Sequence, residues 1–218
     1  DAGSVTFSPS SGTVASSTVY VRLTSSASNG ASGNIACTST GATTVNEATG
    51  SGTVESAPNT QVSSFSSSSV GPETATVSWT RGNGDKVLVI ARASSAVATD
   101  PSNGSSYTAN SAFGSGGAIG SGYVVYDGTG TSVNLTGLSA STTYHFAIYE
   151  YETGNSCNLY NASQLTGNFT TATPSISTSA SFSTFVACTG SSGTAQTFTV
   201  SGSNLTTDIT VTAPTGYE

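Results

Sequence analysis

Charged side chains are scarce in this chain, and their scarcity excludes several classes of protein. Only 7% of its 218 residues are Asp, Glu, Lys or Arg, against about 25% in an average soluble protein. The 4 Lys and Arg residues face 11 Asp and Glu residues, which gives a formal charge of −7. Affinity for a phosphate backbone comes from Lys and Arg displacing its counterions. The composition therefore predicts no nucleic-acid partner.

Long apolar runs and catalytic motifs are also missing. No apolar run approaches the roughly 20 residues that a membrane-spanning helix needs, so we expect no membrane span. No segment keeps a 3.6-residue apolar period over three turns, which argues against helices. The chain has no Met and one His, and no GxSxG motif accompanies that histidine to form a Ser-His-Asp triad. The sequence thus predicts a protein that is not an enzyme.

Short alternating runs of apolar residues are what the chain does have. Apolar residues make up 35% of it, Gly contributes 25 residues, and Ser and Thr together exceed a third. Alternating runs of Val, Ile, Phe and Tyr between Ser/Gly turns are typical of many short strands, so the fold class is predicted to be all-β. Three cysteines in such a low-charge protein favour an oxidising, extracellular setting.

The middle of the chain, residues 58–174, carries the strongest strand signals. In residues 74–80 alternation places Ala75, Val77 and Trp79 on one face. Residues 86–93 are apolar on both faces, as in a strand covered on both sides. Six members of an expected seven-strand set lie at residues 74–80, 86–93, 124–127, 132–135, 143–151 and 168–171. A long Gly/Ser/Asn insertion at residues 97–122 interrupts the set, and we expect it to pack on a surface or carry function.

Two motifs in this region resemble a known family. The pattern Ala75-x-Val77-x-Trp79, followed by Leu138-x5-Tyr144-x-Phe146-x-Ile148, resembles the fibronectin type III fold. The resemblance implies a β-sandwich with a tyrosine corner, in which the hydroxyl of Tyr144 fixes the turn that contains Leu138. Trp79, Leu138 and Tyr144 are accordingly the expected structural core residues. Residues 120–151 also resemble type III-like modules of secreted Bacteroidetes surface proteins, apart from the long insertion.

The two ends of the chain resemble halves of another repeat. Alternation at residues 18–23 puts Val19, Val21 and Leu23 on one face, and further strands are expected at residues 34–39, 43–54, 182–188, 197–200 and 208–212. Residues 196–218 resemble the opening half of an Ig-like repeat of the same proteins, and residues 8–42 resemble its closing half. The resemblance implies that residues 1–57 and 175–218 form one composite β-sandwich, closed within a chain or between chains. The chain is then either a section of a longer array or a subunit whose ends complement one another.

The composite domain also carries an expectation about the cysteines. It places Cys37 and Cys188 in one sandwich, where the resemblance implies a disulfide, either within one chain or between neighbouring chains. The alternative is two separately buried thiols, since free Cys is often buried. Cys157 would be the unlinked thiol.

Tyrosines near the insertion are the candidate ligand-binding residues. Tyr149, Tyr151 and Tyr107 could form an aromatic platform that stacks on sugar rings, because an aromatic face offers apolar area at low entropy cost. The favoured alternative is that the insertion packs on the outer face of the sheet through these residues.

Acidic residues supply the remaining candidates. Glu150 and Glu152 share a face of one strand, near the spacing of the paired carboxylates that hydrolyse sugars, but we expect both to be solvated at the strand end. Calcium held with Asp85, Asp100 or Asp127 is a further alternative, although no EF-hand spacing supports it. We otherwise expect no cofactor.

The sequence therefore favours an extracellular structural or adhesive protein, assembled into a stalk or filament through β-sandwich domains. Its expected partners are other copies or neighbouring repeats, bound through the terminal segments. The alternative is an accessory module that binds a glycan or another surface ligand within a secreted multidomain protein. Fold analogy alone does not choose between the two.

Overall fold

The protein consists of strands and loops over the residues that the computed structural model describes, which are 3–24, 26–154 and 157–218. The predicted all-β fold is confirmed. No helix among these residues is long and apolar enough to cross a membrane. Contacts between Cα atoms divide the chain into two units, Asp1–Ser56 and Ala57–Glu218.

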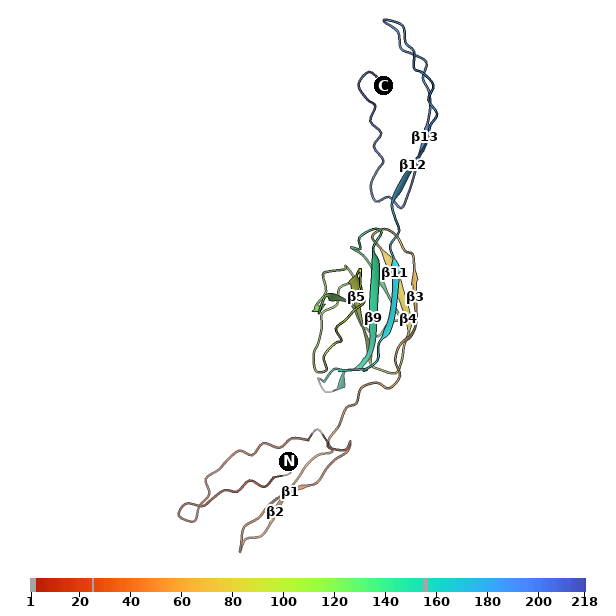
Figure 1. Ribbon diagram of the computed structural model, residues 1–218. Helices are drawn as coiled ribbons and strands as arrows, with labels where there is room; N and C mark the ends of the chain where they lie inside the picture. Colours follow the sequence, from red (N-terminus) through yellow and green to blue (C-terminus); the bar gives the residue numbers. More distant parts are fainter. Residues whose placement is uncertain (1–2, 25, 155–156) are drawn as a thin grey trace. The chain divides into compact units, whose positions relative to one another are not determined.

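Most strands belong to one β-sandwich within the second unit. They are β3 Ser63–Ser68, β4 Ala75–Thr80, β5 Lys86–Ala93, β6 Ala118–Ile119, β7 Gly122–Gly128, β8 Ser132–Leu135, β9 Thr143–Glu152, β10 Leu159–Tyr160 and β11 Leu165–Thr170. One sheet has the order β3-β4-β8, and the other has the order β10-β9-β5-β7-β6, with β11 also paired to β9. All these pairings are antiparallel. Figure 1 shows the two layers, with β3 and β4 beside the sheet that contains β5, β9 and β11.

The core between the two layers is built from the inward faces of alternating strands. In β4, Ala75, Val77 and Trp79 are buried, whereas Thr80 is exposed. Trp79 also packs edge-on against Tyr126, with ring centroids 5.1 Å apart. The remaining buried members of this cluster come from both sheets and from residues just outside their strands: Val62, Val87, Val89, Ala91, Val125, Val133, Leu135, Leu138, Tyr144, Phe146, Ile148 and Phe169. Each fully buried large side chain in such a core contributes on the order of 1.5–3 kcal/mol through the hydrophobic effect.

Strand β5 is covered on both faces, as its sequence predicts. Val87 and Val89 point into the sandwich core, whereas Leu88 and Ile90 belong to a second cluster on the outer face of the same sheet. That second cluster includes Ile119, Tyr149 and Tyr151, and partly buried residues of the insertion pack against it. A second apolar layer therefore lies on the sandwich and is made by the insertion.

Most of the strands expected between residues 74 and 171 are confirmed, but the first sandwich strand is not among those predicted from sequence. β3 has the sequence SSFSSS, and its single apolar residue is Phe65. The Phe65 ring packs against Phe146, with centroids 5.6 Å apart, and lies so close to Gly167 that a Cβ there would clash with it. One aromatic ring seated against a glycine thus holds an edge strand that has no apolar alternation.

The chain enters and leaves this sandwich at opposite ends. Near its start, the Pro58 carbonyl oxygen accepts a hydrogen bond of 2.8 Å from the Asn161 side chain, and the Asn161 amide donates to the carbonyl of Glu150. Near its end, the Ala172 amide donates to the carbonyl of Gly71 and the Thr171 amide to that of Thr142. Thr142 directly precedes β9 and Glu150 lies near its other end, and a strand of this length spans about 30 Å at roughly 3.3 Å per residue.

The described residues outside the sandwich contain two short hairpins. Antiparallel β1 Asn34–Cys37 and β2 Val45–Ala48 lie in the first unit, and antiparallel β12 Ser175–Ser179 and β13 Thr199–Ser203 follow the sandwich. No described residue in 3–56 or 175–218 is buried. The expected strands at residues 18–23, 182–188 and 208–212 are wrong for this structure, since none of the three has a strand partner there. A two-stranded hairpin alone is marginally stable.

Candidate interaction surfaces

A tyrosine corner fixes the turn before β9. The hydroxyl oxygen of Tyr144 accepts a hydrogen bond of 2.9 Å from the backbone N–H of Ser139, and the Leu138 amide donates to the carbonyl of Glu73. Leu138 and Tyr144 are both buried. Tyr144 also meets Phe113 of the insertion edge-on, with centroids 4.8 Å apart. The corner therefore anchors a turn and receives part of the insertion.

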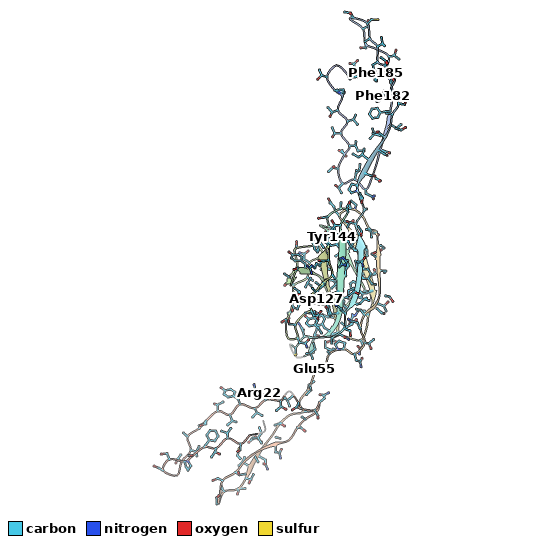
Figure 2. All side chains as sticks on the ribbon, viewed as in Figure 1. Arg22, Glu55, Asp127, Tyr144, Phe182 and Phe185 are labelled. Atoms are coloured by element: carbon cyan, nitrogen blue, oxygen red, sulfur yellow. The ribbon has the colours of Figure 1, made fainter. Side chains whose placement is uncertain are left out.

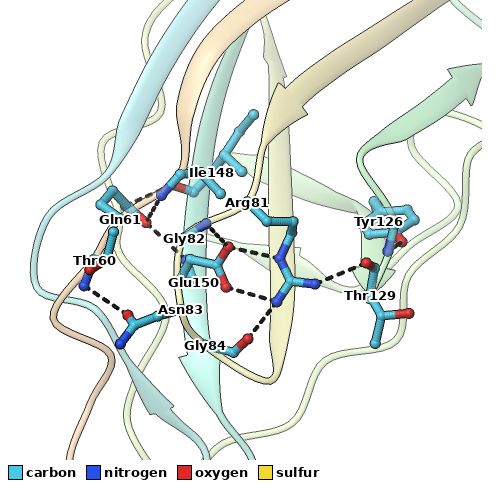
Figure 3. Close-up of polar contacts among 12 residues, drawn as sticks. Thr60, Gln61, Arg81, Gly82, Asn83, Gly84, Tyr126, Thr129, Ile148 and Glu150 are labelled. Atoms are coloured by element: carbon cyan, nitrogen blue, oxygen red, sulfur yellow. Dashed lines mark hydrogen bonds and ion pairs between the residues drawn. The ribbon is translucent and has the colours of Figure 1, made fainter.

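A buried ion pair, which sequence reasoning missed, joins the two sheets near the other end of β9. Arg81 follows β4, and its Nε lies 2.8 Å from Oε1 of Glu150 in β9; Figure 3 shows this network. The guanidinium also donates to Oε2 of Glu150 and to the carbonyl of Gly84, while the Gly82 amide donates to Oε1. The hydrogen bond to Glu150 raises the pKa of Arg81.

This pair corrects the expectation that Glu150 is solvated at a strand end. The Glu150 side chain is 0% exposed and the Arg81 side chain is 20% exposed. A buried carboxylate is tolerated because a guanidinium offers two parallel donors in a geometry that matches it. The two residues are far apart in sequence, and no local pattern signals their contact. Glu150 is therefore a structural residue that closes one end of the sandwich.

The tyrosines proposed as a ligand platform are covered in this structure. Tyr149 is 1% exposed and Tyr151 is 2% exposed, and Tyr107 is one of the insertion residues that cover them. The Tyr149 hydroxyl lies 2.7 Å from side-chain oxygens of Asp100 and Gln164. An exposed stacking platform is thus absent from these residues, and the favoured alternative, that the insertion packs on the outer face of the sheet through them, is confirmed.

Hydrogen bonds and burial both hold this cover in place. The Tyr160 hydroxyl donates to the carbonyl of Ser105 in the insertion at 2.9 Å. The Tyr151 hydroxyl donates to Oδ1 of Asp127 at 2.5 Å and so joins β9 to β7 beneath the insertion. Burial raises the pKa of Tyr149 and Tyr151 above its usual range and raises that of Tyr160 to about 12. These phenols are therefore neutral hydrogen-bond donors at physiological pH.

The insertion also closes the open side of the sandwich. Backbone hydrogen bonds join Asn110 and Gly117 to Val124 of β7. Others join Ser111 and Phe113 to Thr136, just beyond β8. One insertion thus bridges the edges of both sheets and shields unpaired strand edges from other chains.

The carboxylates considered for calcium have partners within the protein. Asp127 accepts from Tyr151, Asp100 from Tyr149, and Asp85 from the amide and hydroxyl of Thr153. Those bonds to Thr153 lower the pKa of Asp85. Among the described residues no group of three or more His, Cys, Asp or Glu side chains could hold a metal ion. Calcium binding therefore has no preformed cluster to support it in this part of the chain.

The three cysteines are exposed and unlinked. Cys37 lies in β1, Cys157 follows Gly154, and Cys188 lies in the last segment; each is a free, exposed thiol. The structure contains no disulfide between Cys37 and Cys188, and neither thiol is buried as the alternative required. A bond between these two residues of neighbouring chains stays a prediction.

Exposed apolar side chains gather on the terminal segments. In the first unit they include Val19, Val21 and Leu23; in the last segment they include Phe182, Phe185, Phe198 and Tyr217. Figure 2 labels Phe182 and Phe185, whose ring centroids are 5.5 Å apart. Large exposed apolar patches on soluble proteins mark interaction sites. These two patches are the candidate functional surfaces of the chain.

Comparisons with known proteins identify similar β-sandwiches. No family model and no curated protein matches the chain. Among solved structures, the chain is similar to a computationally redesigned β-sandwich protein, with 22% identity over 51% of this chain and 94% of that one, at a TM-score of 0.35. It is also similar to a fibronectin type III domain of human collagen XX, with 20% identity over 50% of this chain and 88% of that one, at a TM-score of 0.32. A type III domain of a human fibronectin type III domain containing protein 3 gives 15% identity over 56% of this chain and 92% of that one, at 0.33.

Proposed function

We propose that this chain is a non-catalytic structural or adhesive protein of the cell exterior. It acts as a repeat unit or subunit of a stalk or filament that assembles through β-sandwich domains. The observation that carries this proposal is the contrast in burial: the central sandwich has its own core, whereas no described residue of the terminal segments is buried. Such segments expose apolar side chains until another surface covers them.

The arrangement of the sandwich supports a role as a link in an array. The chain enters near the Glu150 end of β9 and leaves near Thr142 at the other end. Tension on the two termini is then borne along the strands of one sandwich. The insertion and the Arg81–Glu150 pair hold its two sheets together, which suits a load-bearing module.

The terminal segments are the proposed points of assembly. Residues 1–57 of one copy and 175–218 of the next would complete one composite sandwich, and Cys37 and Cys188 would then lie in the same domain. An extracellular setting would permit a disulfide between them. Mapping of non-reduced peptides from assembled protein is expected to find Cys37 linked to Cys188 and Cys157 unlinked; Cys157 bonded to either would contradict this pairing.

The alternative of a carbohydrate-binding accessory module has lost its main support. It depended on exposed Tyr149 and Tyr151, and both are buried beneath the insertion. A glycan or another surface ligand remains a proposed partner only for the assembled protein.

Self-association of the purified chain tests the proposal. Sedimentation velocity at rising concentration, under reducing conditions, is expected to show growing species, and electron microscopy is expected to show elongated particles. Residues 58–174 alone, which carry both apolar clusters, are the matched control and should stay monomeric. A full chain that stays monomeric at every concentration would overturn the proposed function.

A further inference from the structure

The apolar face of the last segment has an aromatic centre. Phe182 meets Phe185 at 5.5 Å and Phe198 at 5.6 Å between ring centroids, and Phe185 meets Tyr217 at 5.3 Å. The Gln196 side chain holds this arrangement together by bonding both the N–H and the C=O of Ser183. These four rings, Phe182, Phe185, Phe198 and Tyr217, are called the aromatic face below.

The aromatic face is organised but uncovered. Its rings are 40–55% exposed, which leaves roughly 350 Å² of aromatic surface in contact with water if a ring buries about 200 Å². A standard protein interface buries about 800 Å² on each partner. The aromatic face thus supplies close to half of such an interface before any neighbouring side chain is counted.

A complementary strip lies near the start of the chain. Val19, Val21 and Leu23 alternate with Tyr20 and Arg22, and the three apolar side chains are 45–60% exposed. Residues 14–23 make no backbone–backbone hydrogen bond to any described residue, and the Ala15 carbonyl accepts one bond from the Ser17 hydroxyl. Both the apolar face and the backbone groups of this strip are therefore available to another strand.

The last segment also contains a stretch without backbone–backbone hydrogen bonds. Residues 205–213, which include Val211, also make no backbone hydrogen bond within the described chain. Two stretches that each lack backbone partners satisfy one another's N–H and C=O groups when they pair in a sheet. Their apolar side chains then fall on the same side, because both alternate with a period of two.

Charge also favours this pairing over pairing of like segments. The last segment, residues 175–218, contains Asp208 and Glu218 and no Lys or Arg. The strip at residues 14–23 contains Arg22 and no acidic residue, whereas Asp1, Glu47 and Glu55 lie elsewhere in the first 56 residues. Two last segments side by side would bring acidic groups together without a cation, whereas the strip brings a positive charge to them.

From these observations we infer that the aromatic face of one copy binds the strip at residues 14–23 of a second copy. The inference rests on the proposed function and specifies its contact. We assign the occupant to a second copy, since the first segment joins the sandwich near the Glu150 end of β9 and the last segment joins it near Thr142. A contact between two different surfaces of identical chains is heterologous, so it propagates as a filament unless its rotation closes a ring.

Complementation between two full-length variants tests this inference. Val21→Asp puts a charge on the strip and leaves the aromatic face intact, whereas Phe198→Asp does the reverse. Both side chains are exposed in the free chain, so the sandwich core is unaffected. Each variant alone is expected to be monomeric in reducing buffer. An equimolar mixture is expected to give a 1:1 dimer that grows no further, because one intact strip meets one intact face.

The control is Tyr20→Asp, which places the same charge next to Val21 on the opposite side of the strip. Tyr20 is 92% exposed, and this variant should assemble as the wild type does. Thermal unfolding followed by the fluorescence of Trp79, which lies in the sandwich core, should have the same midpoint in all three variants.

The outcomes separate this inference from the proposed function. If the wild type assembles but Val21→Asp alone or Phe198→Asp alone still forms dimers, like segments pair with like and the inference is wrong, while the proposed function stands. If both variants are monomeric and their mixture is monomeric too, the strip and the aromatic face do not bind one another. If the wild type does not assemble, both proposals fail together.

Discussion

The central sandwich and the terminal segments show the same strand pattern with opposite outcomes. Ala75, Val77 and Trp79 alternate along β4 and are buried, whereas Val19, Val21 and Leu23 alternate in the same way and are exposed. The difference is the second layer: β4 faces the sheet that contains β5 and β9, whereas the apolar side chains of the strip stay 45–60% exposed. Alternation therefore identifies a face that must be covered, and the covering surface decides whether a strand forms.

Loss of the buried ion pair is expected to have the largest effect on the sandwich. Arg81→Ala leaves the Glu150 carboxylate buried without its guanidinium, which should lower the free energy of unfolding by about 3–5 kcal/mol. Denaturant melts followed by Trp79 fluorescence measure this change. Lys86→Ala is the control, because Lys86 lies 3.9 Å from Asp127 at a more exposed position and such pairs contribute about 0–1 kcal/mol. Equal effects of the two substitutions would contradict the structural role of Arg81.

Shortening one apolar side chain in each region to alanine tests the difference between the buried sandwich and the exposed strip. Ile148 is fully buried between the sheets, so Ile148→Ala should cost about 2–5 kcal/mol through lost burial and the cavity left behind. Val21→Ala should leave the Trp79 melt of the monomer unchanged, since Val21 is 60% exposed. A similar shift from both substitutions would mean that the strip is part of the same cooperative unit.

The tyrosine corner gives a smaller effect. Tyr144→Phe removes the acceptor of the Ser139 amide and keeps the ring in the core, so we expect a loss of about 1–2 kcal/mol in the unfolding free energy. Tyr20→Phe is the matched control, because Tyr20 is exposed. A Tyr144→Phe variant as stable as the wild type would show that the hydrogen bond adds nothing beyond the packing of the ring.

Alkaline pH should gradually lower the unfolding free energy through the tyrosines that lie beneath the insertion. Burial raises the pKa of Tyr160 from 10.0 to about 12, so the folded state holds a proton that the unfolded state loses first. The stability that this provides is complete below pH 10 and is lost as the pH rises from 10 through about 12. Unfolding free energy measured across this range should fall, and less steeply in Tyr160→Phe. A variant with the wild-type slope would exclude Tyr160 as a contributor.

Local sequence patterns were enough to predict the sandwich. Strong alternation around Trp79, apolar residues on both faces of β5, and the spacing of Leu138 from Tyr144 are all short-range signals, and the structure contains the corresponding features. β3 was not predicted, because five of its six residues are serine and no apolar alternation marks it. Its contact with the core is made by the Phe65 ring. The information that fixes β3 lies in Phe146 and Gly167, on strands far along the chain.

The sites were harder to predict than the strands, for a related reason. The pairing of Arg81 with Glu150 and the burial of Tyr149 and Tyr151 depend on contacts between distant segments. The position of Glu150 at a strand end predicted a solvated side chain, and the sequence favoured packing of the tyrosines under the insertion without showing how they are covered. Alternation showed which tyrosines share the outer face, but only the path of the insertion determines what covers that face.

Amide hydrogen exchange at two protein concentrations tests the central claim most directly, which is that the sandwich is complete by itself and that the strip becomes ordered only in the assembly. At a dilution that keeps the chain monomeric, amides of β5 and β9 should exchange slowly and those of Val19 to Leu23 rapidly. At a concentration that gives assembled protein, the amides of Val19 to Leu23 should become slow while β5 and β9 stay as they were. Slow exchange at Val19 to Leu23 in the dilute monomer would contradict the account.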